Sequence, residues 1–88
     1  MKKKMSHKQR FAESAGWYGT AAILAAYILV SFNVISGNSL VFQLLNLTGA
    51  LGIIAIATYK NVKQTIVLNI FWGVIAIAAI IRIFIGTL

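Results

Sequence analysis

No charged residue occurs between Gly16 and Tyr59, and this uncharged stretch is the feature that most restricts what the chain can fold into. A water-soluble domain keeps about a quarter of its residues charged, whereas here the share is 10%, and 60% of the residues are hydrophobic. A chain of 88 residues buries only about two-thirds of its surface on folding, so much apolar surface would remain in water. Disorder is excluded because it requires low hydrophobicity. We therefore predict an integral membrane protein, whose apolar surface is covered by lipid.

The apolar residues fall into three segments, which are Trp17–Ile35, Leu40–Tyr59 and Thr65–Ile85. Each has about 20 residues, which at about 1.5 Å rise per residue match a hydrocarbon core of about 30 Å. They lack the alternation of a membrane β-strand, and backbone groups in lipid must be paired within each segment, as in a helix. The predicted fold class is all-α: a polytopic membrane protein with three transmembrane helices in an antiparallel up-down-up bundle, in which three helix faces meet.

The chain is expected to divide after residue 15. Residues 1–15 would be a basic cytoplasmic arm, of which Ser6–Ala15 could form a short interfacial helix. Residues 16–88 would be the three-helix transmembrane domain. In the break before the second segment, Gly37 and Asn38 suit a tight reversal because both tolerate left-handed backbone.

The net charge of +7 is unevenly distributed along the chain. Seven of the eight basic residues fall in the arm or in the break before the third segment, and they are Lys2, Lys3, Lys4, Lys8, Arg10, Lys60 and Lys63. The positive-inside rule then places the N-terminus in the cytoplasm and the C-terminus on the periplasmic or extracellular side of a bacterial inner membrane. Arg82 is the exception, and it lies close enough to the chain end to extend toward the outer headgroups.

The seven inner basic residues predict contact with anionic lipid headgroups, worth about 1 kcal/mol for each Lys or Arg near the surface. Nucleic acid is not an expected partner, because no aromatic residues interleave the lysines to stack on bases.

Each span has one face of small and polar residues, the kind through which membrane helices associate. These faces comprise Gly19, Ala22, Ala26 and Asn33 in the first span, Asn46, Gly49, Ala50, Ile53 and Ala57 with Gly52 adjacent in the second, and Asn69, Gly73, Ala76 and Ile80 in the third. From their expected depths, Asn33, Gln43 and Asn46 could form a hydrogen-bonded cluster.

Tyr27 is expected near the membrane midplane, where its ring would fill the gap opposite Gly49 and Gly52. Trp72 would lie about 10 Å deep and pack between helices, and Asn69 would meet Thr58 or the end of the first helix. Interfacial positions are expected for Trp17, Tyr18 and Tyr59.

Two interpretations of the intramembrane amides remain open. They could hold helices together at about 0.6 to 2 kcal/mol each, or they could line a solute path together with Tyr27. The spans contain no carboxylate or histidine for a proton relay. The sequence has no nucleophile–base set, metal-ligand spacing or nucleotide motif, so we expect no enzymatic activity, no catalytic residue, no metal and no cofactor.

The strings Trp17–Gly19, Leu44–Gly52 and Val67–Trp72 resemble a family of short bacterial inner-membrane proteins that has no established activity. The likeness covers about residues 16–83, and its most specific parts are L-N-L-T-G-A and L-N-x-x-W. It implies three spans and emphasises Asn46, Gly49, Asn69 and Trp72. A weaker likeness is to half-SWEET transporters, three-helix chains that pair into a sugar pore. It would place Asn69 and Trp72 near the substrate, although this chain has no proline for the hinge of those transporters.

We therefore expect a small structural or accessory inner-membrane protein that self-associates through its Gly, Ala and Asn faces. The alternative is a homo-oligomeric transporter or channel for small solutes, of half-SWEET type. A regulator of a larger membrane-protein partner is a third possibility. The residues expected at helix contacts or along a solute path are Tyr27, Asn33, Gln43, Asn46, Gly49, Gly52, Asn69, Trp72 and Gly73.

Overall fold

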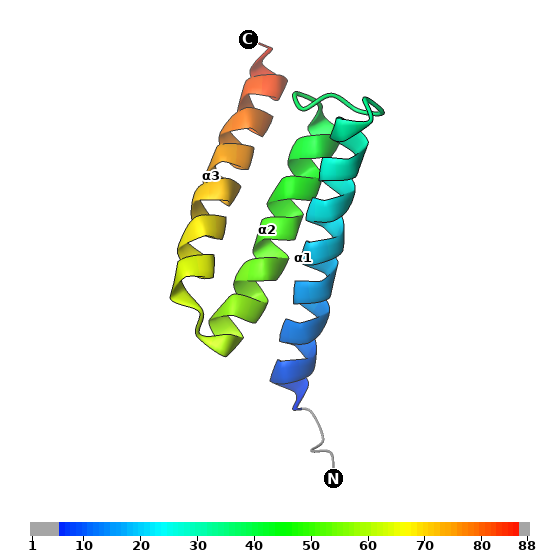
Figure 1. The fold of residues 1–88 in the computed structure, drawn as a ribbon. Coiled ribbons are helices and arrows are strands. Elements are labelled where there is room, and N and C mark those ends of the chain that lie inside the picture. Colours follow the sequence, from blue (N-terminus) through cyan, green and yellow to red (C-terminus); the bar gives the residue numbers. More distant parts are fainter. Residues whose placement is uncertain (1–5, 87–88) are drawn as a thin grey trace.

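The computed structural model describes residues 6–86, which form three antiparallel helices and no strand (Figure 1). Helix α1 runs over His7–Ser31, α2 over Leu40–Lys60 and α3 over Lys63–Ile85. Each of the three is long and apolar enough to cross a membrane. The predicted all-α fold class with three spans is confirmed, and the chain is a multi-pass membrane protein by this measure.

Helix α1 differs most from its predicted span. It begins at His7, because the Ser6 hydroxyl caps it by accepting a hydrogen bond from the Gln9 amide at 3.1 Å. Residues 7–15 are therefore the first turns of one continuous helix, and a separate interfacial helix over Ser6–Ala15 does not form. The helix ends at Ser31, short of the predicted Ile35, as Asn33 turns left-handed with φ 60°.

The reversal between α1 and α2 uses different residues from those expected. Asn33 has the positive φ, whereas Gly37 and Asn38 do not. Asparagine is one of the few residues that visit this conformation readily. The Asn38 amide donates to the Ser36 hydroxyl at 3.1 Å, and the Ser39 hydroxyl caps α2 by accepting from the Phe42 amide at 3.2 Å. The side chains of Ser36 and Ser39 thus pair backbone groups that the helices leave free.

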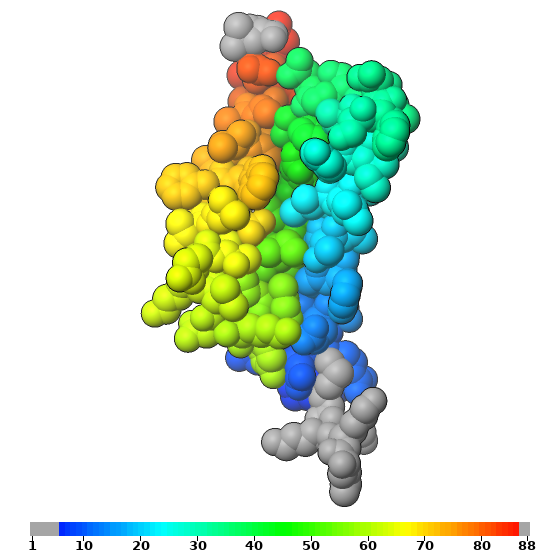
Figure 2. Space-filling model, in the orientation of Figure 1, coloured from blue at the N-terminus to red at the C-terminus, as the bar shows by residue number. Residues whose placement is uncertain are grey.

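Helix α2 lies between the other two, and the backbones of α1 and α3 do not approach each other closely (Figure 1). Gly49 and Gly52 of α2 face α1, and Leu47 faces Gly73 of α3. The small-residue faces of α1 and α2 therefore meet each other, Gly73 of α3 meets a leucine of α2, and the three faces do not meet at one common centre. Figure 2 shows α2 as a strip of green between α3 and α1.

The core of the described chain consists of the smallest side chains. No large side chain in residues 6–86 is fully buried, and the buried hydrophobic residues are all alanines: Ala12, Ala22, Ala26, Ala50, Ala57 and Ala76. Five glycines are buried with them, namely Gly16, Gly19, Gly49, Gly52 and Gly73. Large apolar side chains point outward, as lipid contact requires. Ala12 and Gly16 extend the small face of α1 below the stretch in which we expected it.

The closest contact between α1 and α2 lies at Gly19 and Gly52. A Cβ atom on Gly52 would overlap the Ala15 carbonyl oxygen, and one on Gly19 would lie 2.9 Å from the Ile53 backbone nitrogen. Both neighbours are backbone atoms, which cannot rotate away. In contrast, a Cβ on Gly73 would meet the Leu47 Cδ1 atom at 3.8 Å, an ordinary van der Waals distance.

The substitution Gly52→Ala should therefore destabilise the chain by about 1–3 kcal/mol, the usual cost of overpacking. Gly73→Ala is the matched control and should be neutral or stabilising, because alanine favours a helix over glycine by up to about 1 kcal/mol. Unfolding in mixed micelles by added SDS, followed by circular dichroism, measures both. Equal stability of the two variants would contradict the close α1–α2 contact.

Candidate functional site

One hydrogen bond between side chains joins α1 to α2. The Tyr18 hydroxyl lies 2.6 Å from the Thr48 Oγ1 atom, which itself donates to the Leu44 carbonyl at 2.8 Å. Because the single hydroxyl proton of Thr48 is used on Leu44, Tyr18 is the donor to Thr48. The sequence did not indicate this pair, since its partners lie on different helices and depend on how the helices align.

The ion pair relates positions on α1 to the end of α2. Glu13 lies beside Lys60, the last residue of α2. Measured from Glu13 along α1, Tyr18 lies about 8 Å and Tyr27 about 21 Å away, at about 1.5 Å per residue.

Contrary to the prediction, Tyr27 does not pack opposite Gly49 and Gly52. Its side chain is 70% exposed, and the space over the two glycines is filled by Ile23 and by the backbone of Ala15 and Gly19.

The predicted cluster of Asn33, Gln43 and Asn46 does not form. Asn33 lies in the turn after α1, and the Gln43 Nε2 atom donates to the Gly37 carbonyl at 3.1 Å. No hydrogen bond within residues 6–86 joins these three amides. The cause is the early end of α1, which removes Asn33 from the helix face that was to carry it.

Asn69 is the one buried polar residue in the described part of the chain, with 5% of its surface exposed. Its Nδ2 atom donates to the Thr65 carbonyl one turn earlier in α3, at 2.9 Å. It therefore bonds to its own helix and not to Thr58 or α1.

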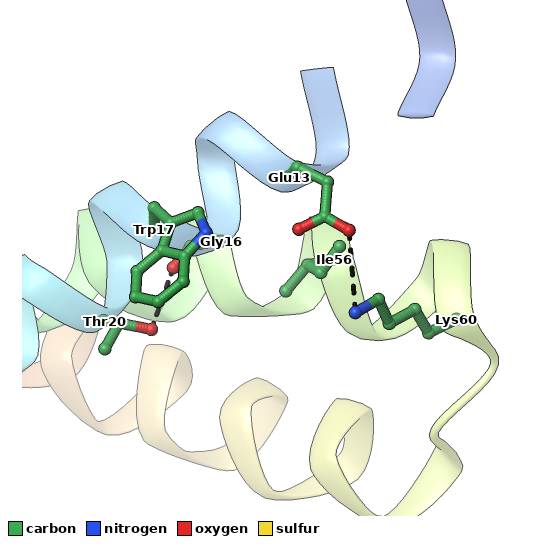
Figure 3. Close-up of a pocket in the computed structure, with 6 residues that line it drawn as sticks. All are labelled: Glu13, Gly16, Trp17, Thr20, Ile56 and Lys60. Atoms are coloured by element: carbon green, nitrogen blue, oxygen red, sulfur yellow. Dashed lines mark hydrogen bonds and ion pairs between the residues drawn. The ribbon is translucent and has the colours of Figure 1, made fainter. Parts of the chain in front are cut away.

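The end of the molecule near the connection from α2 to α3 carries an ion pair. The Lys60 Nζ atom lies 3.6 Å from the Glu13 Oε2 atom, and the two side chains are 56% and 30% exposed (Figure 3). At that exposure the pair contributes at most about 1 kcal/mol to stability. Glu13 is the only acidic residue of the chain. A single acidic residue next to an apolar span is the feature of the sequence that could have indicated this ion pair.

A small pocket surrounds this ion pair. It has a volume of about 180 Å³ and is lined by Glu13, Gly16, Trp17, Thr20, Ile56 and Lys60 (Figure 3). The Thr20 hydroxyl donates to the Gly16 carbonyl at 2.9 Å, so it is already paired within α1.

A larger apolar groove follows along α2 toward the other end. It has a volume of about 600 Å³ and is lined by Thr20, Ile23, Leu24, Tyr27, Ile53 and Trp72. The groove brings together Tyr27 and Trp72, two of the residues expected at helix contacts or along a solute path. Trp72 is 47% exposed, so it borders this groove and is not enclosed between helices. Within residues 6–86, no three His, Cys, Asp or Glu side chains gather as a metal site would need.

Four of the five basic residues that the structure describes gather toward one end, and Arg82 lies at the other. Lys8 and Arg10 are exposed on the first turns of α1, and Lys60 and Lys63 flank the connection from α2 to α3. This is the end near the N-terminus in Figure 1. Lys2, Lys3 and Lys4 lie outside the described residues.

A protein-family model matches residues 12–87, which include nearly all of the three helices. The chain belongs to this family. The family is uncharacterised, so membership assigns no activity to the groove or to the ion pair. Comparisons with curated proteins and with solved structures gave no significant match.

Removing the hydroxyl in Tyr18→Phe should cost about 0.6 kcal/mol of stability, the mean for a hydrogen bond between membrane helices. Thr48→Val should cost more, because it also removes the bond to the Leu44 carbonyl. A double-mutant cycle in SDS unfolding isolates the Tyr18–Thr48 term, and Tyr59→Phe serves as a tyrosine control on an exposed site. Strict additivity of the two losses would rule out the bond.

Proposed function

We propose that the chain is a small structural or accessory protein of a bacterial inner membrane. The observation that carries this proposal is the burial of the small residues. The Gly and Ala faces are buried where α2 packs against α1 and α3. The result is a tightly joined set of three spans with large apolar side chains outside. Such a molecule suits a role in which it is held in the bilayer and presents surfaces to lipid or protein.

The alternative role as a solute transporter has less support. A solute path needs amides that are free to bind the solute in a wet cavity. Asn69 is buried and already bonded to Thr65, and Gln43 is bonded to Gly37. Because both amides have backbone partners, they support the structural interpretation.

The distribution of charge supports an orientation for this proposal. The end that carries Lys8, Arg10, Lys60 and Lys63 is basic, whereas the turn over residues 32–39 has no charged residue. By the positive-inside rule the basic end lies in the cytoplasm, with the C-terminus on the opposite side.

Self-association stays within the proposal, but we propose it for another surface. Because the Gly and Ala faces are covered within one chain, a second copy would pack on large outer side chains. The outer face of α3 is the best candidate, since α3, like α1, has only α2 as a neighbour and packs against it less extensively than α1 does. Phe71, Val74 and Ile75 on that helix are 65%, 57% and 63% exposed. A larger membrane-protein partner would bind the same face of α3.

The orientation can be tested with single cysteines, because the chain has none of its own. Asn38→Cys and Gln64→Cys lie at opposite ends, and both native residues are exposed. In intact spheroplasts a membrane-impermeant maleimide should label Asn38→Cys at once and Gln64→Cys only after lysis. The reverse labelling pattern would contradict the proposed orientation.

The self-association surface can be tested by oxidative crosslinking in native membranes. Ile75→Cys should give a disulfide-linked dimer, whereas Leu51→Cys should not. The two sites are matched, as each lies near the middle of its helix and they are 63% and 57% exposed. Equal dimer from both would indicate random collision, and dimer from neither would show that α3 is not an interface between copies.

A further inference from the structure

The pocket at the ion pair and the apolar groove adjoin each other at Thr20, which lines both, and together we call them the furrow. Ile56 lines the pocket and Ile53 lines the groove, and these two residues lie one helical turn apart on α2. From Glu13 to Tyr27 this furrow follows α1 for about 21 Å at 1.5 Å per residue. One leaflet of a hydrocarbon core about 30 Å thick occupies about 15 Å, so the furrow is long enough for the acyl chain of one leaflet.

The chemistry of the furrow changes from one end to the other. The end nearer the N-terminus holds the Glu13 carboxylate and the Lys60 ammonium group, and the Trp17 indole lines the same pocket next to Thr20 (Figure 3). The inner part of the furrow is lined by Ile23, Leu24 and Ile53 together with aromatic rings. The charged pocket corresponds to the headgroup of a phospholipid, and the apolar groove corresponds to its acyl chain.

We propose that this furrow binds one phospholipid whose headgroup carries both a phosphate and an ammonium group, such as phosphatidylethanolamine. The lipid phosphate would lie at Lys60 and its ammonium group at Glu13. One acyl chain would lie along the apolar groove and pass Leu24. The inference rests on the chain spanning the membrane with this end at one surface. It does not require a structural or accessory role.

The ion pair favours a headgroup with both charges over a purely anionic one. At 3.6 Å, Glu13 and Lys60 are too far apart for a direct hydrogen bond, and both are partly exposed, so each retains bonding capacity. An anionic headgroup would be attracted by Lys60 and repelled by Glu13. An ammonium-bearing headgroup satisfies both groups.

A second copy of the chain fits the furrow less well. A second copy in the same orientation would bring its own ends to this depth, and they carry Lys8, Arg10, Lys60 and Lys63 against Glu13 alone. Lys60 would then face mainly like charge, which is unfavourable at an interface. A headgroup with one phosphate and one ammonium group offers an opposite charge to both Lys60 and Glu13.

The test uses the full-length protein in micelles with equimolar phosphatidylethanolamine and phosphatidylglycerol, with retained lipid counted by native mass spectrometry. The native protein should retain one phosphatidylethanolamine in preference to phosphatidylglycerol. Glu13→Gln and Lys60→Gln should each lower that retention by about fivefold, equivalent to about 1 kcal/mol. Leu24→Trp should lower the retention of phosphatidylethanolamine as well, because the larger ring fills the apolar groove.

Matched controls are Arg82→Gln, which removes a charge at the other end, and Leu51→Trp, which enlarges a similarly exposed side chain on the outer surface of α2. Both should retain lipid as the native protein does. Equal retention of the two lipids, or equal loss in Arg82→Gln, would overturn the proposal. So would a lipid-free dimer that Leu24→Trp disrupts, because a second copy would then occupy the furrow.

Flotation with vesicles of the same two lipids separates this inference from the proposed function. A chain that fails to float with the vesicles is not a membrane protein, and both proposals fall. A chain that floats but shows no preference for phosphatidylethanolamine contradicts the lipid site alone. Circular dichroism of every variant shows whether the helices are intact.

Discussion

The close approach of the α1 and α2 backbones at Gly19 and Gly52 is the contact on which the rest of the structure depends. Lipid is as apolar as the side chains, so helices in a bilayer gain little from hiding apolar surface and associate through close packing. Packing energy falls steeply with separation, and here glycine removes the atoms that would hold the helices apart. This contact fixes how far α1 is displaced along α2. The displacement in turn brings Glu13 to Lys60 and Tyr18 to Thr48.

The central position of α2 follows from the contacts that two different sides of this helix make. One side, with Gly49 and Gly52, contacts α1, and Leu47 on another side contacts α3. Because α1 and α3 are held on different sides, their backbones stay apart and the furrow between them remains open. Three helices with equal stripes around a common axis would have closed it. The furrow is thus a consequence of where the small residues lie.

The number and type of the elements could be predicted from the sequence because both follow from local properties. Hydropathy and length identify the spans, and the second was predicted to within one residue, since Ser39 and Lys60 mark its ends. The first was misplaced because a capping serine extends it into the basic arm, while Asn33 ends it early. The partners of Tyr18 and Glu13 could not be predicted. They depend on the relative displacement of two helices, which a glycine contact determines and which no periodicity in one helix reveals.

Glu13 has a position that the topology of the chain does not explain. Orientation in the membrane depends on Lys and Arg, and acidic residues contribute little to it. A partly buried carboxylate next to an apolar span also carries a solvation cost that a neutral residue would avoid. The arm already holds five basic residues, so one acid there changes the attraction to anionic headgroups only slightly. The function of Glu13 must therefore be local, and its surroundings are Lys60, Trp17 and the head of the furrow. A carboxylate beside an ammonium group at that depth distinguishes headgroups by their positive charge, which lysines alone cannot do.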